Sequence, residues 1–98
     1  MENNEELGKI KKKIIPVLKE YNVTKAGIFG SYARGDHKKN SDIDILIEIN
    51  NKAGLIEIIR LKGLLQKATK KKVDLVEYET IRKELRDQIL NDEVRILQ

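Results

Sequence analysis

Apolar residues recur at spacings of three and four in two parts of this chain, residues 5–21 and residues 55–68. Such spacing gathers apolar side chains on one face of a helix, so both segments are predicted to be amphipathic helices. Pro16 lies inside the first segment and has no backbone N–H to donate. It therefore favours a kink or a late helix start near its own position.

Strict alternation marks residues 43–49, where isoleucine occupies every odd-numbered position. A period of two predicts a strand with one strongly apolar face. Shorter apolar runs predict two further strands, at residues 26–29 and 73–78. The tail, residues 93–97, is expected either to add a short strand or to pack as an extended end.

The segments between these elements complete their order. Ser31 is expected to cap a helical turn over residues 32–34, and residues 35–41 are expected to form a loop. A final helix is predicted to open at Thr80. Its inward-facing residues are expected to be Leu85, Ile89 and Leu90. The order α-β-α-β-α-β-α predicts a single α/β or α+β domain over residues 1–98, with a small mixed sheet flanked by helices.

Composition removes several kinds of site. The chain has no cysteine, which excludes disulfides, thiolate chemistry and zinc sites of the cysteine type. Its one histidine, His37, cannot by itself make a histidine-rich metal site or a Ser-His-Asp triad. No apolar run approaches the roughly 20 residues of a membrane helix, and the N-terminal MENNEELGK has no secretory apolar region. We therefore expect a cytoplasmic protein that makes no membrane contact.

Charge adds little at the level of the whole chain. The net charge is +4, and charged residues of both signs make up 37% of the sequence. This mild excess suits an anionic ligand but does not by itself predict nucleic-acid binding, and we do not expect the chain to bind nucleic acid directly. Residues 37–39 are expected to be a solvated loop. The run Lys70-Lys71-Lys72 is expected to be an exposed turn, with contact to an anionic partner as the alternative.

Two carboxylates stand at the start of the most hydrophobic stretch, in the sequence Ser-Asp-Ile-Asp-Ile that contains Asp42 and Asp44. Residues two apart on a strand project from one face, so these carboxylates repel each other at a half-buried surface. A counter-cation removes that penalty, and paired oxygen ligands suit Mg²⁺. If the second and third strands are neighbours, Asp74 joins the pair. Three aspartates are enough for a two-metal centre of phosphoryl transfer.

Gly30-Ser31 supplies a complementary phosphate-binding half. A glycine after a strand lets the backbone approach a phosphate closely. The amides at the start of the following turn, with the Ser31 hydroxyl, can bind phosphate oxygens. Arg34, one helical turn further on, can add a charge-assisted contact. Metals on one side and amides on the other would clamp a nucleoside triphosphate.

Each of these signals has a plainer explanation when it is taken alone. A Gly-Ser after a strand is usually a turn, and an Asp-x-Asp pair at a strand start is often solvated loop polarity. A single strand aspartate such as Asp74 is usually a surface residue. The combination in one chain is far more specific than any of its parts.

The segment GSYARGDHKKNSDIDILI resembles the minimal nucleotidyltransferase (MNT) family, the MntA-type antitoxins, within the nucleotidyltransferase fold typified by DNA polymerase beta. The pattern is Gly30-Ser31, ten residues, then Asp42-Ile43-Asp44, with a later strand aspartate at Asp74. The resemblance covers residues 23–78 closely and the flanking helices plausibly. No catalytic position departs from the family pattern.

The resemblance implies a nucleotidyltransferase that moves AMP from ATP with Mg²⁺, two ions being expected. It implies that Asp42 and Asp44 hold the metals, and that Asp74 completes the site and helps to deprotonate the acceptor hydroxyl. It also implies that Gly30 and Ser31 hold the β- and γ-phosphates. Similar proteins adenylylate a tyrosine on a HEPN-domain ribonuclease toxin and silence it, so such a toxin is the expected partner.

Two alternatives stay open. The chain could be a non-catalytic binding module that masks its partner by contact alone, although a vestigial site has no reason to keep mutually repelling carboxylates. It could also be a nucleotidyltransferase that acts on a small molecule or an RNA 3′ end. No additional domain that would recognise such an acceptor is present in the sequence, which counts against this second alternative.

Overall fold

The computed structural model describes residues 2–49 and 54–98, with side chains from residue 5 onward. The elements follow one another as α1 (Glu2–Glu20), β1 (Val23–Phe29), α2 (Ser31–Arg34), β2 (Ile43–Ile49), α3 (Leu55–Thr69), β3 (Val73–Glu77), a 3₁₀ turn η1 (Tyr78–Thr80), α4 (Lys83–Asp92) and β4 (Val94–Leu97). Within these ranges, no helix is both long enough and apolar enough to cross a membrane.

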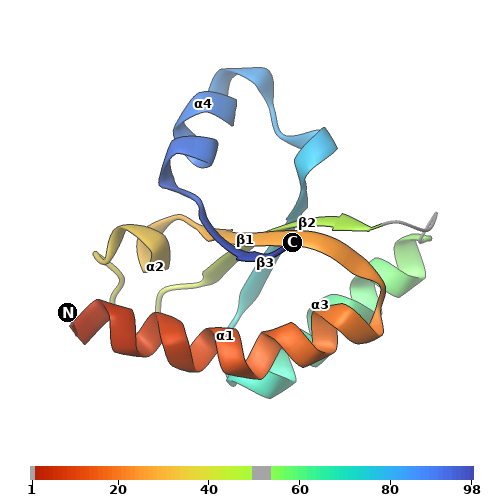
Figure 1. The fold of residues 1–98 in the computed structure, drawn as a ribbon, viewed down its shortest axis with the longest axis horizontal. Helices are drawn as coiled ribbons and strands as arrows, with labels where there is room; N and C mark the ends of the chain where they lie inside the picture. Colours follow the sequence, from red (N-terminus) through yellow and green to blue (C-terminus); the bar gives the residue numbers. More distant parts are fainter. Residues whose placement is uncertain (1, 50–53) are drawn as a thin grey trace.

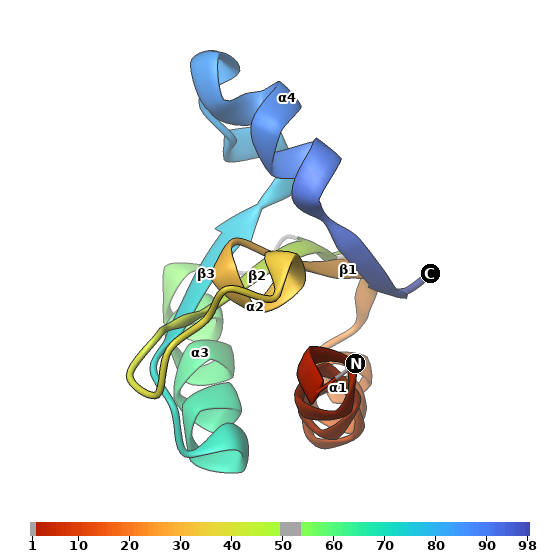
Figure 2. The ribbon, with the colours of Figure 1, turned by 90° about the vertical axis from the view of Figure 1, so that its left-hand side faces the viewer.

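The strands form one mixed sheet in the order β3-β2-β1-β4. β1 pairs antiparallel with β2 on one side and with β4 on the other, whereas β2 and β3 run parallel. Helices α1 and α3 lie side by side against one face of the sheet, and α4 lies over the opposite face (Figures 1 and 2). The predicted fold class, a small mixed sheet flanked by helices, is confirmed.

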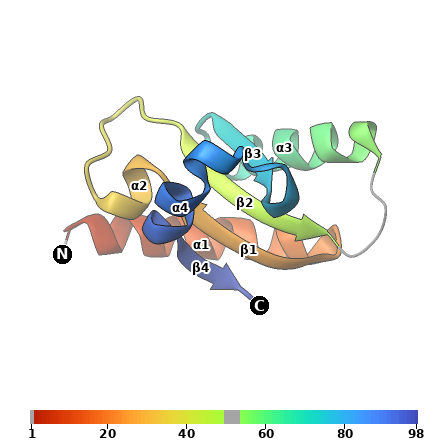
Figure 3. The ribbon, with the colours of Figure 1, turned by 90° about the horizontal axis from the view of Figure 1, so that it is seen from above.

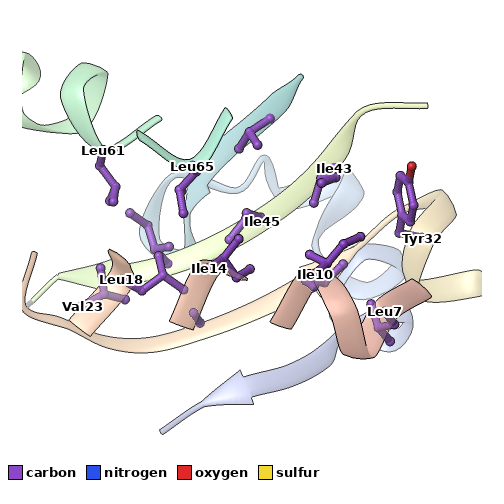
Figure 4. Packing of buried hydrophobic residues seen from close by; sticks show 14 residues of the cluster. Leu7, Ile10, Ile14, Leu18, Val23, Tyr32, Ile43, Ile45, Leu61 and Leu65 are labelled. Carbon is purple, nitrogen blue, oxygen red and sulfur yellow. The ribbon is translucent and has the colours of Figure 1, made fainter. Parts of the chain in front are cut away.

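The main core lies between the sheet and the α1–α3 pair. Ile43, Ile45 and Ile47 of β2 are fully buried there, as the period of two predicts. They meet fully buried side chains of α1 and α3, which are Ile14, Leu18, Leu61 and Leu65 (Figure 4). Burial of this face holds the register of β2, because a slip of one residue would expose every isoleucine.

A second, smaller cluster lies on the α4 face of the sheet. Leu46, the apolar residue among the even-numbered positions of β2, is fully buried against Tyr78 and Ile81. Ile89 and Leu90 of α4 pack on this cluster and stay partly exposed. Both faces of the sheet are therefore covered, but the α4 face much more loosely.

Of the two effects expected of Pro16, a kink and a late helix start, the late start does not occur. The late helix start is wrong, because α1 begins at Glu2 and continues through Pro16 to Glu20. Pro16 is exposed, while Ile10, Ile14 and Leu18 are buried along one side of the helix. Burial of that apolar side outweighs the one backbone hydrogen bond that proline removes.

The C-terminal third differs from expectation in three places. The third strand ends at Glu77, and Tyr78 begins η1. The last helix begins at Lys83 and not at Thr80. Leu85 was expected to face inward but is 46% exposed, whereas Ile89 and Leu90 do face the sheet. The first of the two expectations for the tail is confirmed, because it forms strand β4.

Leu65 and its neighbour Leu64 provide a matched test of the core. Leu65 is fully buried and Leu64 is 40% exposed on the same helix. We expect Leu65→Ala to lower the free energy of unfolding by about 2–5 kcal/mol, because it opens a cavity in a close-packed interior. Leu64→Ala should cost less than about 1 kcal/mol. Urea unfolding followed by circular dichroism measures both, and equal losses would contradict the assigned packing.

Candidate functional site

The parallel register of β2 and β3 brings two of the three predicted aspartates together. Asp44 and Asp74 are paired positions on these neighbouring strands. Because Ile43 and Ile45 are buried on the α1–α3 side, Asp44 projects from the opposite face, beneath α4. Asp42 comes directly before β2 and is exposed. The conditional prediction that Asp74 lies alongside the pair is confirmed for Asp44.

Electrostatics at this point are unfavourable to a bare carboxylate. The pKa of Asp44 is raised from 3.8 to about 6, mainly by burial and then by the charges of Asp74 and Asp42. Arg34 acts in the opposite sense and only weakly. Asp44 is therefore a half-buried carboxylate that a cation, or a proton, would stabilise.

Gly30 is fitted against Asp44. Its φ of 76° and ψ of −152° lie in a region that only glycine adopts readily. A Cβ added at Gly30 would overlap the Asp44 carboxylate, with the carboxyl Cγ 3.0 Å away. The turn after β1 thus approaches the β2 carboxylate as closely as a backbone can.

The expected capping role of Ser31 is wrong. Gly30 occupies the cap position of α2, Ser31 is the first helical residue, and the cap makes no side-chain hydrogen bond. The backbone conformation of Gly30 explains this, because it turns the chain directly into the helix without a capping oxygen. The Ser31 hydroxyl is consequently not used for capping.

A hollow of about 390 Å³ lies between α2, the ends of β1 and β2, and α4, which lies over the sheet next to α2 (Figure 3). It brings together four of the six predicted site residues. Its lining consists of Phe29, Gly30, Ser31, Arg34, Asp44, Leu85, Gln88, Ile89 and Asp92. Asp42 lines a different hollow, described below, and Asp74 lines neither of the two.

Sequence reasoning missed the α4 side of this hollow. Leu85, expected in the core, faces the hollow and is therefore half exposed. Asp92 was not predicted either, yet its Oδ2 lies 3.2 Å from Nη1 of Arg34. Its position near the end of a helix carried no signal, because the partner is 58 residues away in the sequence.

Arg34 is held by two carboxylates at the rim of the hollow. Its Nε donates to Asp36 at 3.1 Å and its Nη1 donates to Asp92 at 3.2 Å. The hydrogen bonds to Asp36 and Asp92 raise the pKa of Arg34 above its already high usual value. The guanidinium is a permanent cation in position to meet an anion, provided that the anion displaces one of its carboxylate partners.

The carboxylates suit a metal ion that shares its ligands with a substrate. Within residues 5–49 and 54–98, no three His, Asp or Glu side chains are arranged to hold a metal ion on their own. Mg²⁺ commonly takes one or two carboxylates, several waters and the oxygens of substrate phosphates. The hard oxygen donors and the mutual repulsion around Asp44 fit this mode of binding.

The loop that follows α2 departs from one expectation. His37 is not a solvated residue, because its ring stacks on the buried Tyr32 ring with 4.1 Å between the centroids. Its Nδ1 is buried and has no hydrogen-bond partner within the described part of the chain. Lys38 and Lys39 are exposed, as expected.

Comparison with protein families agrees with this geometry. The family described as "Polymerase beta, Nucleotidyltransferase" matches residues 12–98. The chain belongs to the polymerase beta nucleotidyltransferase family. This nucleotidyltransferase is thus an enzyme, and the matched range contains the Gly30 turn, Asp42, Asp44 and Asp74.

Similar proteins of known name and structure narrow the comparison. A Methanocaldococcus jannaschii relative, named as a protein adenylyltransferase, is 45% identical over 91 residues, which cover 93% of this nucleotidyltransferase and 98% of the relative. A toxin–antitoxin crystal structure with AMP-PNP superposes with a TM-score of 0.77 at 28% identity, covering 88% of this chain and 71% of that one. The MNT antitoxin in complex with a tri-AMPylated Shewanella oneidensis HEPN toxin gives a TM-score of 0.69 at 25% identity, with 89% and 68% covered.

Gly30→Ala tests the close approach of the turn to Asp44. The substitution forces an L side chain into a positive-φ conformation and onto the carboxylate, so we expect it to lower stability by about 1–3 kcal/mol. Gly63→Ala in α3 is the matched control, because a Cβ there meets nothing within 4 Å. It should be neutral or slightly stabilising, since alanine is the better helix former. Similar urea midpoints for the two variants would contradict the geometry.

Asp44→Asn should stabilise the metal-free nucleotidyltransferase at neutral pH and lose that advantage in acid. Because the folded-state pKa of about 6 lies above the ordinary 3.8, the native state holds the extra proton, and stability falls as pH rises between these values. Asparagine cannot ionise and escapes this loss.

The measurement is urea unfolding at about pH 4 and about pH 8 in the presence of a chelator. Asp87→Asn, at an exposed position of α4, is the control and should show no such gain. An equal effect of Asp44→Asn at the two pH values would contradict the raised pKa.

Proposed function

We propose that this nucleotidyltransferase transfers AMP from ATP, with Mg²⁺, to a tyrosine hydroxyl of a cognate HEPN-domain toxin and thereby silences the toxin. The carrying observation is the half-buried Asp44, paired in register with Asp74 and facing Gly30, Ser31 and Arg34 across one hollow. The names of the M. jannaschii relative and of the two toxin–antitoxin structures support AMP transfer and this class of partner.

Asp42, Asp44 and Asp74 are the residues that would hold Mg²⁺. The metal, when bound with ATP, neutralises charge on the phosphates and orients the reacting oxygens. Asp44 and Asp74 are held side by side by β2 and β3, so the unfavourable burial and repulsion at Asp44 would be relieved by a bound cation. The pairing of β2 with β3 therefore positions Asp44 and Asp74 before any substrate binds.

Gly30, Ser31 and Arg34 are assigned to the β- and γ-phosphates. Gly30 offers a backbone surface without a Cβ, and the Ser31 hydroxyl is not engaged in capping α2. Arg34 exchanges Asp92 or Asp36 for phosphate oxygens, a charge-assisted contact of the same kind. The triphosphate then lies on the β1 side of the carboxylates.

The transfer step is an in-line displacement. The acceptor oxygen forms a bond to the α-phosphorus while the bond from that phosphorus to the β-phosphate bridging oxygen breaks, and pyrophosphate leaves. Asp74 is assigned the proton of the acceptor hydroxyl. The product is a phosphodiester between AMP and the acceptor.

A protein acceptor fits what this chain offers around the site. The hollow beneath α4 is open, and Leu85 at its rim is 46% exposed, so a second protein can complete its wall. The proposal keeps the sequence-based expectation of a cytoplasmic location, because ATP is supplied there. Two alternatives would each give a different result in the test below. In one, the chain masks its partner by contact alone; in the other, the acceptor is a small molecule or RNA.

The deciding experiment is intact-mass analysis of a co-expressed HEPN-domain partner after incubation with Mg²⁺ and ATP. We expect the partner to gain one or more AMP units and to lose ribonuclease activity. Asp42→Asn/Asp44→Asn should reduce transfer by at least about 10³-fold, since it removes the charge that the metal needs. Chelation of Mg²⁺ should have the same effect on the wild-type protein.

Glu20→Gln/Asp87→Asn is the matched control, because it removes two exposed carboxylates that line neither hollow. It should retain most of the activity. Full protection from the toxin by the Asp42→Asn/Asp44→Asn variant, with no mass change on the partner, would overturn the proposal in favour of a binding module. Mass gain on RNA or a small molecule and none on protein would assign a different acceptor.

A further inference from the structure

A second hollow, of about 380 Å³, opens beside the site, next to Asp42 at the start of β2. The loop before β2 and the turn before β3 form its walls. Its lining is Lys39, Asn40, Ser41, Asp42, Lys70, Lys71 and Lys72. The turn predicted to be merely exposed therefore borders one of the three candidate metal-binding aspartates.

This second hollow, the lysine hollow, carries uncompensated positive charge. It has four lysines against one carboxylate, Asp42. Among the side chains at residues 5–49 and 54–98, these lysines take part in none of the ion pairs, which involve Arg34 and Arg95 instead. Four ammonium groups around one concave surface repel one another, so an anion bound there gains more than at a scattered surface lysine.

The backbone fixes the walls of the lysine hollow. The Ile43 amide donates to the Lys72 carbonyl at 2.9 Å, which ties the turn to the start of β2. Lys70 ends α3 in the left-handed conformation with its amide bonded to the Gln66 carbonyl at 2.7 Å. Lys71 lies over the buried Tyr32 ring, 5.9 Å from its centroid. The lysines therefore project from an ordered turn.

The order of the strands places the two hollows on opposite sides of the carboxylates. The turn proposed to bind phosphate follows β1, Asp44 belongs to β2 with Asp42 directly before it, and the lysine-bearing turn leads into β3. In-line displacement requires the attacking oxygen and the leaving pyrophosphate to stand on opposite sides of the α-phosphorus. With the triphosphate on the β1 side, the acceptor enters from the β3 side, next to the lysines.

We propose that the lysine hollow binds the phosphodiester of an AMP unit already attached to the acceptor, and so favours addition of a second and third AMP. The inference rests on the proposed function. The tri-AMPylated toxin of the similar complex supports it, because serial addition presents such a phosphodiester next to the new attacking hydroxyl. The ribose hydroxyl of the attached AMP then attacks the next ATP, pyrophosphate leaves, and the proton passes to Asp74.

Binding is tested first, without any transfer. The probe is the dinucleotide pApA, titrated by calorimetry into the full-length protein with Mg²⁺ and saturating AMP-PNP. The variant Lys70→Gln/Lys71→Gln/Lys72→Gln removes three charges of the lysine hollow. The variant Lys11→Gln/Lys12→Gln/Lys13→Gln removes the same charge from α1, which lines neither hollow.

We expect the hollow variant to weaken pApA binding by about tenfold or more, and the α1 variant by less than about threefold. If the triple hollow variant fails to fold, Lys39→Glu in the exposed loop replaces it and should weaken binding similarly. Equal losses in the two triple variants, or no pApA binding by the wild type, would overturn the proposal. Tighter binding of a tRNA than of pApA through the same lysines would also overturn it, in favour of an RNA ligand.

Transfer provides the second arm, read by intact mass on the HEPN-domain partner. The hollow variant should add the first AMP within about threefold of the wild-type rate and later AMP units at least about tenfold more slowly. Equal slowing of every addition would overturn the inference. A wild type that transfers no AMP at all would contradict the proposed function, while the pApA titration would still decide what the lysine hollow binds.

Discussion

The site depends on the register of β2 and β3, which holds the carboxylate of Asp44 beside that of Asp74 although the two repel each other. Asp44 cannot move away from Asp74 with its strand, because the flanking Ile43 and Ile45 are fully buried on the other face of β2. Relief by a slip of one residue would expose the entire apolar face. Burial of the apolar face thus holds Asp44 in place, although its own burial and the neighbouring carboxylates raise its pKa, and a cation or a proton would relieve both effects.

Most of this arrangement could be predicted from the sequence. Isoleucine at every second position of residues 43–49 predicts both a strand and the face of it that is buried. Gly30 was equally readable, since a glycine directly after a strand signals close approach. The contribution of α4 to the lining of the hollow could not be predicted. An amphipathic helix does not reveal whether an apolar residue such as Leu85 faces a core or a hollow. Asp92 meets Arg34 only after the chain has returned across the sheet.

The way in which α4 is attached to the sheet also explains why the hollow beneath it stays open. Tyr78, before α4, donates its hydroxyl to Glu93, directly after α4, so the two ends of the helical segment are tied together over β1 (Figure 1). Glu93 also accepts from Arg95 at 2.9 Å. Between these ends every residue of α4 stays at least partly exposed. A helix fixed at its ends and loosely packed along its length leaves room beneath it for a ligand.

The net charge of the chain does not reveal where the fold places its charged side chains. A net charge of +4 on 98 residues suggests little, yet the fold places different groups of cations on the two sides of β2. The β1 side presents one arginine shared with two carboxylates, which a triphosphate can enter by exchange. The β3 side presents lysines that no carboxylate among the described side chains neutralises by an ion pair. On the proposed function, phosphate would bind on both sides of the carboxylates, and the product of one transfer would then be placed to act as the acceptor of the next.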